Sequence, residues 1–234
     1  MKRKLDNVTL IIIDCVETKR AEQSLDICLE DMEFKEVKFL TSLETKSPYK
    51  VAIEHIPNIE KFSEFCLKEL TNYVDTEFVF LVQWDGFILN PQSWEDSFLN
   101  YDYIGAPFYV SQWQIDNNNF PQELKGSYQT GNGGFCIRSK RFLDLTSQLS
   151  HEGVFPKYQP EDVAVCIWHR KKLEENGIRF APTEIAARFS IEGTRETYRN
   201  QFGFHGLAWT DISLWIENNP KWSIPKYYKK LQIQ

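Results

Sequence analysis

The first part of the chain alternates continuous apolar runs with longer amphipathic segments. The runs, such as "VTLIII" and "FVFLV", are rich in β-branched and aromatic residues and have the length of strands that are buried on both faces. The amphipathic segments repeat apolar residues every three or four positions, which predicts helices. The predicted elements are strands at 8–13, 34–40, 50–56 and 78–82 and helices at 17–32 and 58–74. Strands that alternate with helices indicate βαβ units, a mainly parallel sheet and right-handed crossovers.

The second half of the chain has a less regular pattern. It predicts a short helix at 93–101, strands at 103–107, 133–139 and 178–182, a long polar segment at 111–130 and helices at 139–150 and 160–177. No internal repeat, low-complexity tract or linker composition interrupts the sequence. The pattern therefore predicts one domain over residues 1–234.

The composition excludes some functions. The chain has 234 residues, 42% of them hydrophobic, which is enough for a substantial core. Its 27 basic and 33 acidic residues give a net charge of −6, so no global basic field recruits nucleic acid. The five cysteines are odd in number and lack CxxC spacing. They predict reduced, mostly buried thiols in a cytosolic protein, rather than disulfides or a zinc site.

The amino-terminal apolar run only superficially resembles a secretory leader. It is six residues long and an aspartate follows it at once, which favours a buried strand. No other window approaches the roughly 18 apolar residues that a membrane span needs. We therefore expect a soluble, cytoplasmic protein that is at most peripheral to a membrane.

Four short motifs carry candidate chemistry, and the first is "QWDG" at the end of the strand predicted at 78–82. Ligands of open α/β sheets bind beyond the carboxyl ends of strands, so Asp85 is placed to meet a ligand. The Asp-Gly pair is also typical of tight turns. For Asp85 alone, a turn is the simpler interpretation.

The second motif, "GNGG", comprises Gly131, Asn132, Gly133 and Gly134. Its glycines allow positive φ angles and a close approach of the backbone to a ligand. An ordinary glycine-rich turn explains them equally well. A nucleotide P-loop is excluded, because the GxxxxGK[ST] spacing is absent.

Glu161 and Asp162 open the helix predicted at 160–177, and His205 lies in "FGFHG". Acidic residues in a first helical turn complement the helix dipole, which explains both carboxylates without catalysis. The functional alternative is that one of them faces a cleft as a general base. A histidine among aromatic and small residues is more often a hydrogen-bonded core residue, but neutral imidazole also binds divalent cations.

Together and in this order, the four motifs resemble those of GT-A-type glycosyltransferases, which transfer a sugar from a nucleotide-diphosphate donor. The stretches "VQWDGFILNPQSWEDSFLNYDYIGAP", "GNGGFCIRSKRFL", "PEDVAVC", "GIRFAPTEIAARFSIE" and "FGFHG" are similar to those of a bacterial and viral family of uncharacterised function within that superfamily. The resemblance runs from about Phe78 to Gly206. It implies an α/β, single-domain GT-A (Rossmann-like) fold with a mainly parallel sheet flanked by helices. It further implies a nucleotide-sugar-binding half at 1–90, an acceptor-side half at 91–215 and a tail at 216–234.

By this resemblance, "QWD" stands where the superfamily carries the DxD motif that holds a metal ion and the donor diphosphate. Gln83 replaces the first acid, so Asp85 is the only carboxylate, and His205 is the implied second ligand of manganese or magnesium. An enzyme that neutralises the diphosphate with lysine or arginine instead of a metal is an open alternative. The implied donor-binding residues are Asp14, Arg20, Gln83, Trp84 and Asp85.

The resemblance also implies how the acceptor is bound and activated. Asp162, with Glu161 as its neighbour on the same turn, would remove the proton from an acceptor hydroxyl, with inversion at the anomeric carbon. The backbone of Gly131 to Gly134 would line the pocket for the donor sugar and the acceptor. Trp113, in the polar segment, can stack on a sugar ring or anchor in the core. The implied partners are a nucleotide-diphosphate sugar and a glycan, glycolipid or glycoprotein acceptor, as in polysaccharide biosynthesis.

Other interpretations remain open for the function and for the tail. An inactive nucleotide-sugar or carbohydrate-binding module fits the incomplete DxD motif. A metal-dependent hydrolase fits less well, because the adjacent Glu161 and Asp162 point in different directions on a helix. The tail "NPKWSIPKYYKKLQIQ" predicts either a contact with an anionic membrane or a strap across the domain surface.

Overall fold

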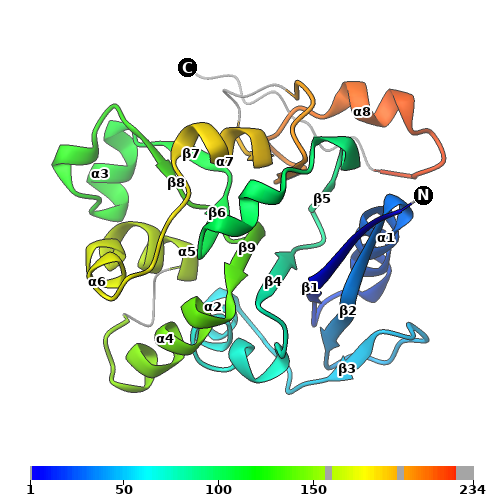
Figure 1. Cartoon of the computed structure of the whole chain (residues 1–234), viewed down its shortest axis with the longest axis horizontal. Coiled ribbons are helices and arrows are strands. Elements are labelled where there is room, and N and C mark those ends of the chain that lie inside the picture. The colour runs from blue at the N-terminus through cyan, green and yellow to red at the C-terminus, as the bar shows by residue number, and fades with distance from the viewer. Residues whose placement is uncertain (1, 156–159, 194–197, 225–234) are drawn as a thin grey trace.

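The computed structural model describes residues 2–155, 160–193 and 198–224 (Figure 1). Its strands are β1 (Arg3–Ile13), β2 (Met32–Thr41), β3 (Lys50–Ala52), β4 (Phe78–Val82), β5 (Gly86–Ile88), β6 (Tyr103–Gly105), β7 (Pro107–Tyr109), β8 (Tyr128–Thr130), β9 (Phe135–Ser139), β10 (Ser190–Ile191) and β11 (Gly203–His205). Its α-helices are α1 (Thr18–Asp31), α2 (Ile59–Lys68), α3 (Gln112–Asn118), α4 (Lys140–His151), α5 (Glu161–Val163), α6 (Arg170–Glu175), α7 (Thr183–Phe189) and α8 (Ser213–Asn218). The 3₁₀ turns span Leu70–Tyr73, Pro91–Ser93, Asp96–Asn100 and Gln122–Leu124, and a π turn spans Ala164–Trp168.

The central sheet has six strands in the order β3-β2-β1-β4-β9-β6. The first four strands are parallel to one another, and β9 is antiparallel to both of its neighbours. The predicted α/β fold with a mainly parallel sheet is confirmed. The reversal at β9 brings the chain that precedes it to the carboxyl end of β4, where the Gln83 N–H donates to the Gly134 carbonyl over 2.8 Å.

Helices cover both faces of this sheet, as Figure 1 shows. Leu10 of β1 and Phe80 of β4 pack with the apolar side of α1 in one buried cluster. The alternate residues Ile11 and Leu81 pack with α2 and α4 in another. All four side chains are fully buried, which is why residues 10–13 of β1 and 78–82 of β4 are apolar at every position instead of at every second one.

The second half of the chain differs most from the sequence prediction. The strand predicted at 178–182 is wrong: only a single bridge forms, between Tyr103 and Phe180. Pro182, which has no N–H for pairing, follows directly and caps the start of α7. The helix predicted at 160–177 is interrupted by the π turn, in which the His169 N–H donates to the Ala164 carbonyl over 2.9 Å.

The polar segment 111–130 is more ordered than its composition suggests. It contains the helix α3, which begins at a capping box formed by Ser111 and Gln114. It also contains β8, which pairs antiparallel with β7. These elements are held by side-chain capping and strand pairing. They were not predicted because the prediction relied on apolar periodicity.

A second, three-stranded sheet was not predicted and has the order β10-β11-β5. Its strands are two or three residues long, too short to show a periodic pattern. β11 pairs antiparallel with β5, and this register sets His205 opposite Gly86. The Gly206 N–H also donates to the Asp85 carbonyl over 2.9 Å. Two motifs that lie more than a hundred residues apart in sequence are therefore adjacent.

A buried ion pair fixes α5 to the central sheet. Arg138 of β9 is fully buried, and its Nη2 donates to Glu161 Oε1 over 2.8 Å. Glu161 is itself only 3% exposed. Because an isolated charge is costly to bury, the two side chains depend on each other.

We expect Glu161→Gln to lower the free energy of unfolding by about 3 kcal/mol or more, because it leaves Arg138 buried without a counter-charge. Urea denaturation at neutral pH measures this loss. The matched control is Glu174→Gln, which breaks the partly exposed Arg170–Glu174 pair on α6 and should cost less than about 1 kcal/mol. Equal losses for the two variants would contradict the structural role of Arg138 and Glu161.

Candidate functional site

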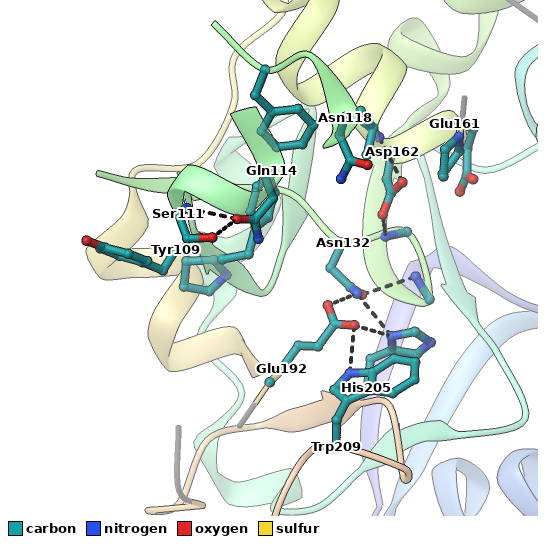
Figure 2. A pocket seen from close by; sticks show the side chains of 18 of the residues that line it. Tyr109, Ser111, Gln114, Asn118, Asn132, Glu161, Asp162, Glu192, His205 and Trp209 are labelled. Atoms are coloured by element: carbon teal, nitrogen blue, oxygen red, sulfur yellow. Dashed lines mark hydrogen bonds and ion pairs between the residues drawn. The ribbon is translucent and has the colours of Figure 1, made fainter. Parts of the chain in front are cut away.

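A cavity of about 610 Å³ opens beyond the carboxyl end of β4 (Figure 2). It lies where β4 and the antiparallel β9 meet, and ligands of an open α/β sheet usually bind beyond the carboxyl ends of its strands. Its lining includes Gln83 after β4, Gly133 and Gly134 before β9, Asp162 of α5 and His205 of β11. The structure thus brings residues from all four sequence motifs to one cavity or its immediate wall.

His205 lies at the centre of a polar cluster and is only 8% exposed. Its Nδ1 is 3.1 Å from Glu192 Oε1. On the other side of the ring, Nε2 is 3.2 Å from Asp85 Oδ1 and 3.1 Å from Gln83 Oε1. Each ring nitrogen therefore faces at least one oxygen acceptor, to which a protonated imidazole donates, and Nδ1 also lies 3.0 Å from the Asn132 side-chain nitrogen.

The charge state of His205 follows from these neighbours. Burial by itself lowers the pKa of the imidazole, because it disfavours the charged form. The carboxylates of Glu192 and Asp85 outweigh burial and raise the pKa of His205 to about 10. In this structure His205 is thus a buried cation between two carboxylates.

Asn132 organises the loop that leads into β9. Its φ angle of +61° is left-handed, a conformation that asparagine tolerates better than most residues. Its side-chain oxygen accepts from the backbone N–H groups of Gly134 and Phe135, each over 3.1 Å. Its side-chain nitrogen donates to the Glu192 carboxylate. The asparagine therefore links the "GNGG" loop to the His205 cluster.

The glycines of this loop leave space for neighbouring protein side chains as well as for the cavity. A Cβ on Gly134 would lie 2.0 Å from His205 Nε2, and a Cβ on Gly133 would lie 2.3 Å from Glu161 Oε1. At Gly131 a Cβ would meet the ring of Phe108 at 2.3 Å. The close approach predicted for the loop is therefore present, but the groups that need the space are these side chains.

Asp162 and Glu161 have different surroundings. Asp162 Oδ2 accepts from the Gly133 N–H over 3.0 Å, and its Oδ1 accepts from the Val163 N–H over 2.7 Å. Burial, Glu161 and Glu192 raise the pKa of the Asp162 carboxyl to about 6. Glu161 instead pairs with Arg138. Asp162 is thus the carboxylate with a pKa near neutrality at this cavity.

A divalent cation at Asp85 would replace the proton on His205 Nε2, because a protonated ring nitrogen has no lone pair for a metal. Asp85 and His205 present an oxygen and a nitrogen 3.2 Å apart, and the Gln83 side-chain oxygen lies beside them. Glu192 on Nδ1 is a typical partner of a metal-binding histidine. No group of three or more His, Cys, Asp or Glu residues suited to a metal occurs among the described residues, so phosphate oxygens and water would complete the shell.

The predicted donor residues do not all reach this cavity. Arg20 donates to Asp14 from Nε over 2.7 Å, and its guanidinium lies 4.5 Å from the centre of the Trp84 ring. Arg20 and Trp84 line a separate cavity of about 250 Å³. Asp14 is buried and also accepts from the N–H groups of Val16 and Glu17. Asp14 therefore orders the start of α1. With Arg20 it lies on the side of Trp84, whereas Gln83 faces the main cavity.

Two residues of the site carried no signal in the sequence. Glu192 contacts His205 and Asn132, and Trp209 donates from Nε1 to Glu192 Oε1 over 3.1 Å. Both line the cavity. Glu192 ends the stretch "GIRFAPTEIAARFSIE", so only the family resemblance could have singled it out.

The charge of the cavity lining is one-sided. Among the described residues that line it, three carboxylates occur and no lysine or arginine. The exposed Trp113 lies at its edge, 63% accessible, and is not part of the core. The alternative of a diphosphate neutralised by lysine or arginine therefore has no support from the described lining.

The described part of the tail contacts α1. Lys221 forms an ion pair with Glu30 of α1, and Trp222 donates to the same carboxylate over 3.2 Å. Residues 225–234, which carry the other predicted basic contacts, lie outside the described residues. None of the described helices combines the length and the apolar character needed to cross a membrane.

Comparison with solved structures identifies the fold. A glycosyltransferase involved in the glycosylation of the major capsid of PBCV-1 is 14% identical, with 92% of this chain and 98% of that chain covered and a TM-score of 0.50. The galactosyltransferase LgtC, in complex with donor and acceptor sugar analogs, is also 14% identical, with 93% and 98% covered and a TM-score of 0.50. The predicted GT-A fold is thus confirmed at the level of architecture.

Two other matches are longer proteins, of which this chain spans about half. The mannosyltransferase PcManGT from Pyrobaculum calidifontis, in complex with GDP-Man and Mn²⁺, is 13% identical, with 76% of this chain and 55% of that chain covered and a TM-score of 0.43. The bifunctional IspDF from Campylobacter jejuni is 10% identical, with 75% and 48% covered and a TM-score of 0.45.

Sequence comparison gives one family. No curated protein matches the sequence significantly. The model of a family described as "Protein of unknown function (DUF5672)" matches residues 48–205, more than half of the chain, including "QWDG", "GNGG", "PEDV" and His205. On this match, the chain belongs to the DUF5672 family.

Proposed function

We propose that this chain is a glycosyltransferase that transfers a sugar from a nucleotide-diphosphate sugar to a hydroxyl of a glycan or glycoconjugate. The observation that carries the proposal is the arrangement of two different groups on one cavity. Figure 2 shows Asp162 on one side of Asn132 and the Glu192–His205 cluster on the other. A carboxylate with a raised pKa thus faces a cavity whose other wall contains His205, and Asp85 lies 3.2 Å from the His205 ring without lining the cavity.

The Asp162 carboxylate is the proposed general base. It accepts the proton of the acceptor hydroxyl, and the acceptor oxygen forms a bond to the anomeric carbon of the donor sugar. The bond from that carbon to the diphosphate oxygen breaks, and its electron pair leaves with the nucleoside diphosphate. Attack opposite the leaving group inverts the anomeric configuration. The ion pair with Arg138 makes Glu161 a positioning residue for Asp162 and not a second base.

The opposite wall is the proposed diphosphate site. Asp85 and the His205 imidazole, once Nε2 has lost its proton, would hold manganese or magnesium, which when bound supplies positive charge to the leaving diphosphate. Glu192 orients the imidazole through Nδ1, and Gly134 leaves room for the ring. The absence of lysine and arginine from the described lining supports a metal-dependent enzyme over a metal-independent one.

We expect manganese-dependent binding of one nucleotide sugar from a UDP-, GDP-, dTDP- and CMP-linked panel, measured by isothermal titration calorimetry. Asp85→Ala should weaken this binding by about 100-fold or more, as should a chelator, because the diphosphate loses its counter-charge. The matched control is Asp75→Ala, whose side chain is 86% exposed and does not line the cavity. If no nucleotide sugar binds with or without manganese, the glycosyltransferase proposal fails.

We expect kcat/KM for transfer to fall about tenfold per pH unit below pH 6, because a general base must be deprotonated and Asp162 has a pKa of about 6. Asp162→Asn should lower kcat by about 100-fold or more while nucleotide-sugar binding persists. The control is Asp144→Asn on the exposed side of α4. A flat rate between pH 5 and 7, or an active Asp162→Asn, would remove Asp162 from this role. Donor binding without transfer to any acceptor would favour the binding-module alternative.

A further inference from the structure

We propose that the acceptor is an uncharged oligosaccharide that stacks on Trp113 and continues past Tyr128 into a second cavity. The proposal deepens the glycosyltransferase assignment and rests on it for the direction of the reaction. The binding surface itself is argued from three independent features of the molecule. These are the position of exposed aromatic side chains, the adjacency of two cavities and the charge of their linings.

Exposed apolar side chains are concentrated around the main cavity. Six large hydrophobic residues in the described part of the chain are exposed, and four of them line this cavity. They are Ile59, Trp113, Tyr128 and Trp209. Water-exposed apolar surface gathered at one rim marks a binding site. Aromatic rings present flat apolar faces, which suit the C–H faces of sugar rings.

Trp113 is held by a rigid element rather than by a free loop. The capping box of Ser111 and Gln114 starts α3, and Ile115 of the same helix packs against the buried cluster of Val110, Phe120 and Ile167. Trp113 itself is nevertheless 63% exposed. A fixed backbone with an exposed indole at a cavity edge is a preorganised stacking surface.

A second cavity of about 270 Å³ adjoins the first. The two share Pro107 and Tyr128 in their linings, so Tyr128 stands at the boundary between them. The Tyr128 ring packs against Tyr109, with 5.4 Å between ring centres, which fixes the boundary in place. Residues from α7 and β10 form the far side of the second cavity. A ligand longer than one sugar can therefore extend from the reaction site along this path.

The linings of both cavities disfavour an anionic acceptor. In the described residues, the first contributes the carboxylates of Asp162 and Glu192, with Glu161 paired to Arg138, and the second contributes that of Glu184. Neither includes a lysine or arginine in the part of the chain that the structure describes. His205 is already enclosed by carboxylates. A uronate, sialic acid or phosphorylated sugar would meet like charges, whereas an uncharged sugar would not.

The first test measures glycan binding without any nucleotide sugar. Maltotetraose, cellotetraose, mannotetraose and chitotetraose are compared with an oligogalacturonide of equal length by saturation-transfer NMR. We expect at least one uncharged tetrasaccharide to bind and the oligogalacturonide to bind more weakly by about tenfold or more. Binding of the anionic chain alone, or of no chain, would overturn the proposal.

The second test uses variants of the stacking surface. Trp113→Ala should weaken tetrasaccharide binding by about tenfold, and Trp113→Phe should restore most of it, because phenylalanine keeps an aromatic face. The matched control is Leu214→Ala on α8, which removes an equally exposed apolar side chain that lines neither cavity. Unchanged binding by Trp113→Ala would contradict the stacking role.

The third test concerns the second cavity. Ala187 of α7 is exposed and lines the second cavity but not the main one, so Ala187→Phe narrows the second cavity with little effect on the core. We expect this variant to bind the tetrasaccharide no better than the matching monosaccharide, whereas the wild type prefers the longer chain. Equal effects on both ligands would contradict an extended acceptor. Glycan binding in a protein that binds no nucleotide sugar would uphold this surface and reject the glycosyltransferase assignment.

Discussion

The buried imidazole of His205 is the interaction on which the site depends. A cation in this position is stable only because Glu192 and Asp85 approach it from opposite sides. Its ring fits only because Gly134 has no side chain. Its backbone is held because β11 pairs with β5 directly after Asp85. The two carboxylates, Gly134 and the pairing of β11 with β5 thus all accommodate the His205 ring.

The position of the His205 ring is also linked to that of Asp162, on the other wall of the cavity. Asn132 joins the His205 cluster to the loop before β9, and the next residue, Gly133, donates to Asp162. The Arg138–Glu161 pair then fixes α5, so that Asp162 cannot move independently of the sheet. The proposed base is therefore linked to the proposed diphosphate site through the loop before β9, and to the central sheet through Arg138. Such links are what holding two reactants in position requires.

The charges around the cavity affect each part of the proposed reaction. Burial and the carboxylates of Glu161 and Glu192 raise the pKa of Asp162, and the described lining contains no lysine or arginine. In the proposed function, a diphosphate would need a cation brought with it, and an acceptor would be better tolerated when it carries no negative charge. One charge distribution thus bears on the base, the donor and the acceptor.

The sequence by itself determined the α/β class, the first strands and helices and the identity of Asp85, Asp162 and His205 as candidate residues, because fully buried strands and chemistry-bearing motifs are local patterns. It did not determine the three-stranded sheet, the role of Glu192 or the pairing of Arg138 with Glu161. Those depend on contacts between residues far apart in the chain, in elements of two or three residues that show no periodicity. Only the tertiary structure decided which carboxylate is neutralised by a buried arginine and which one faces the cavity.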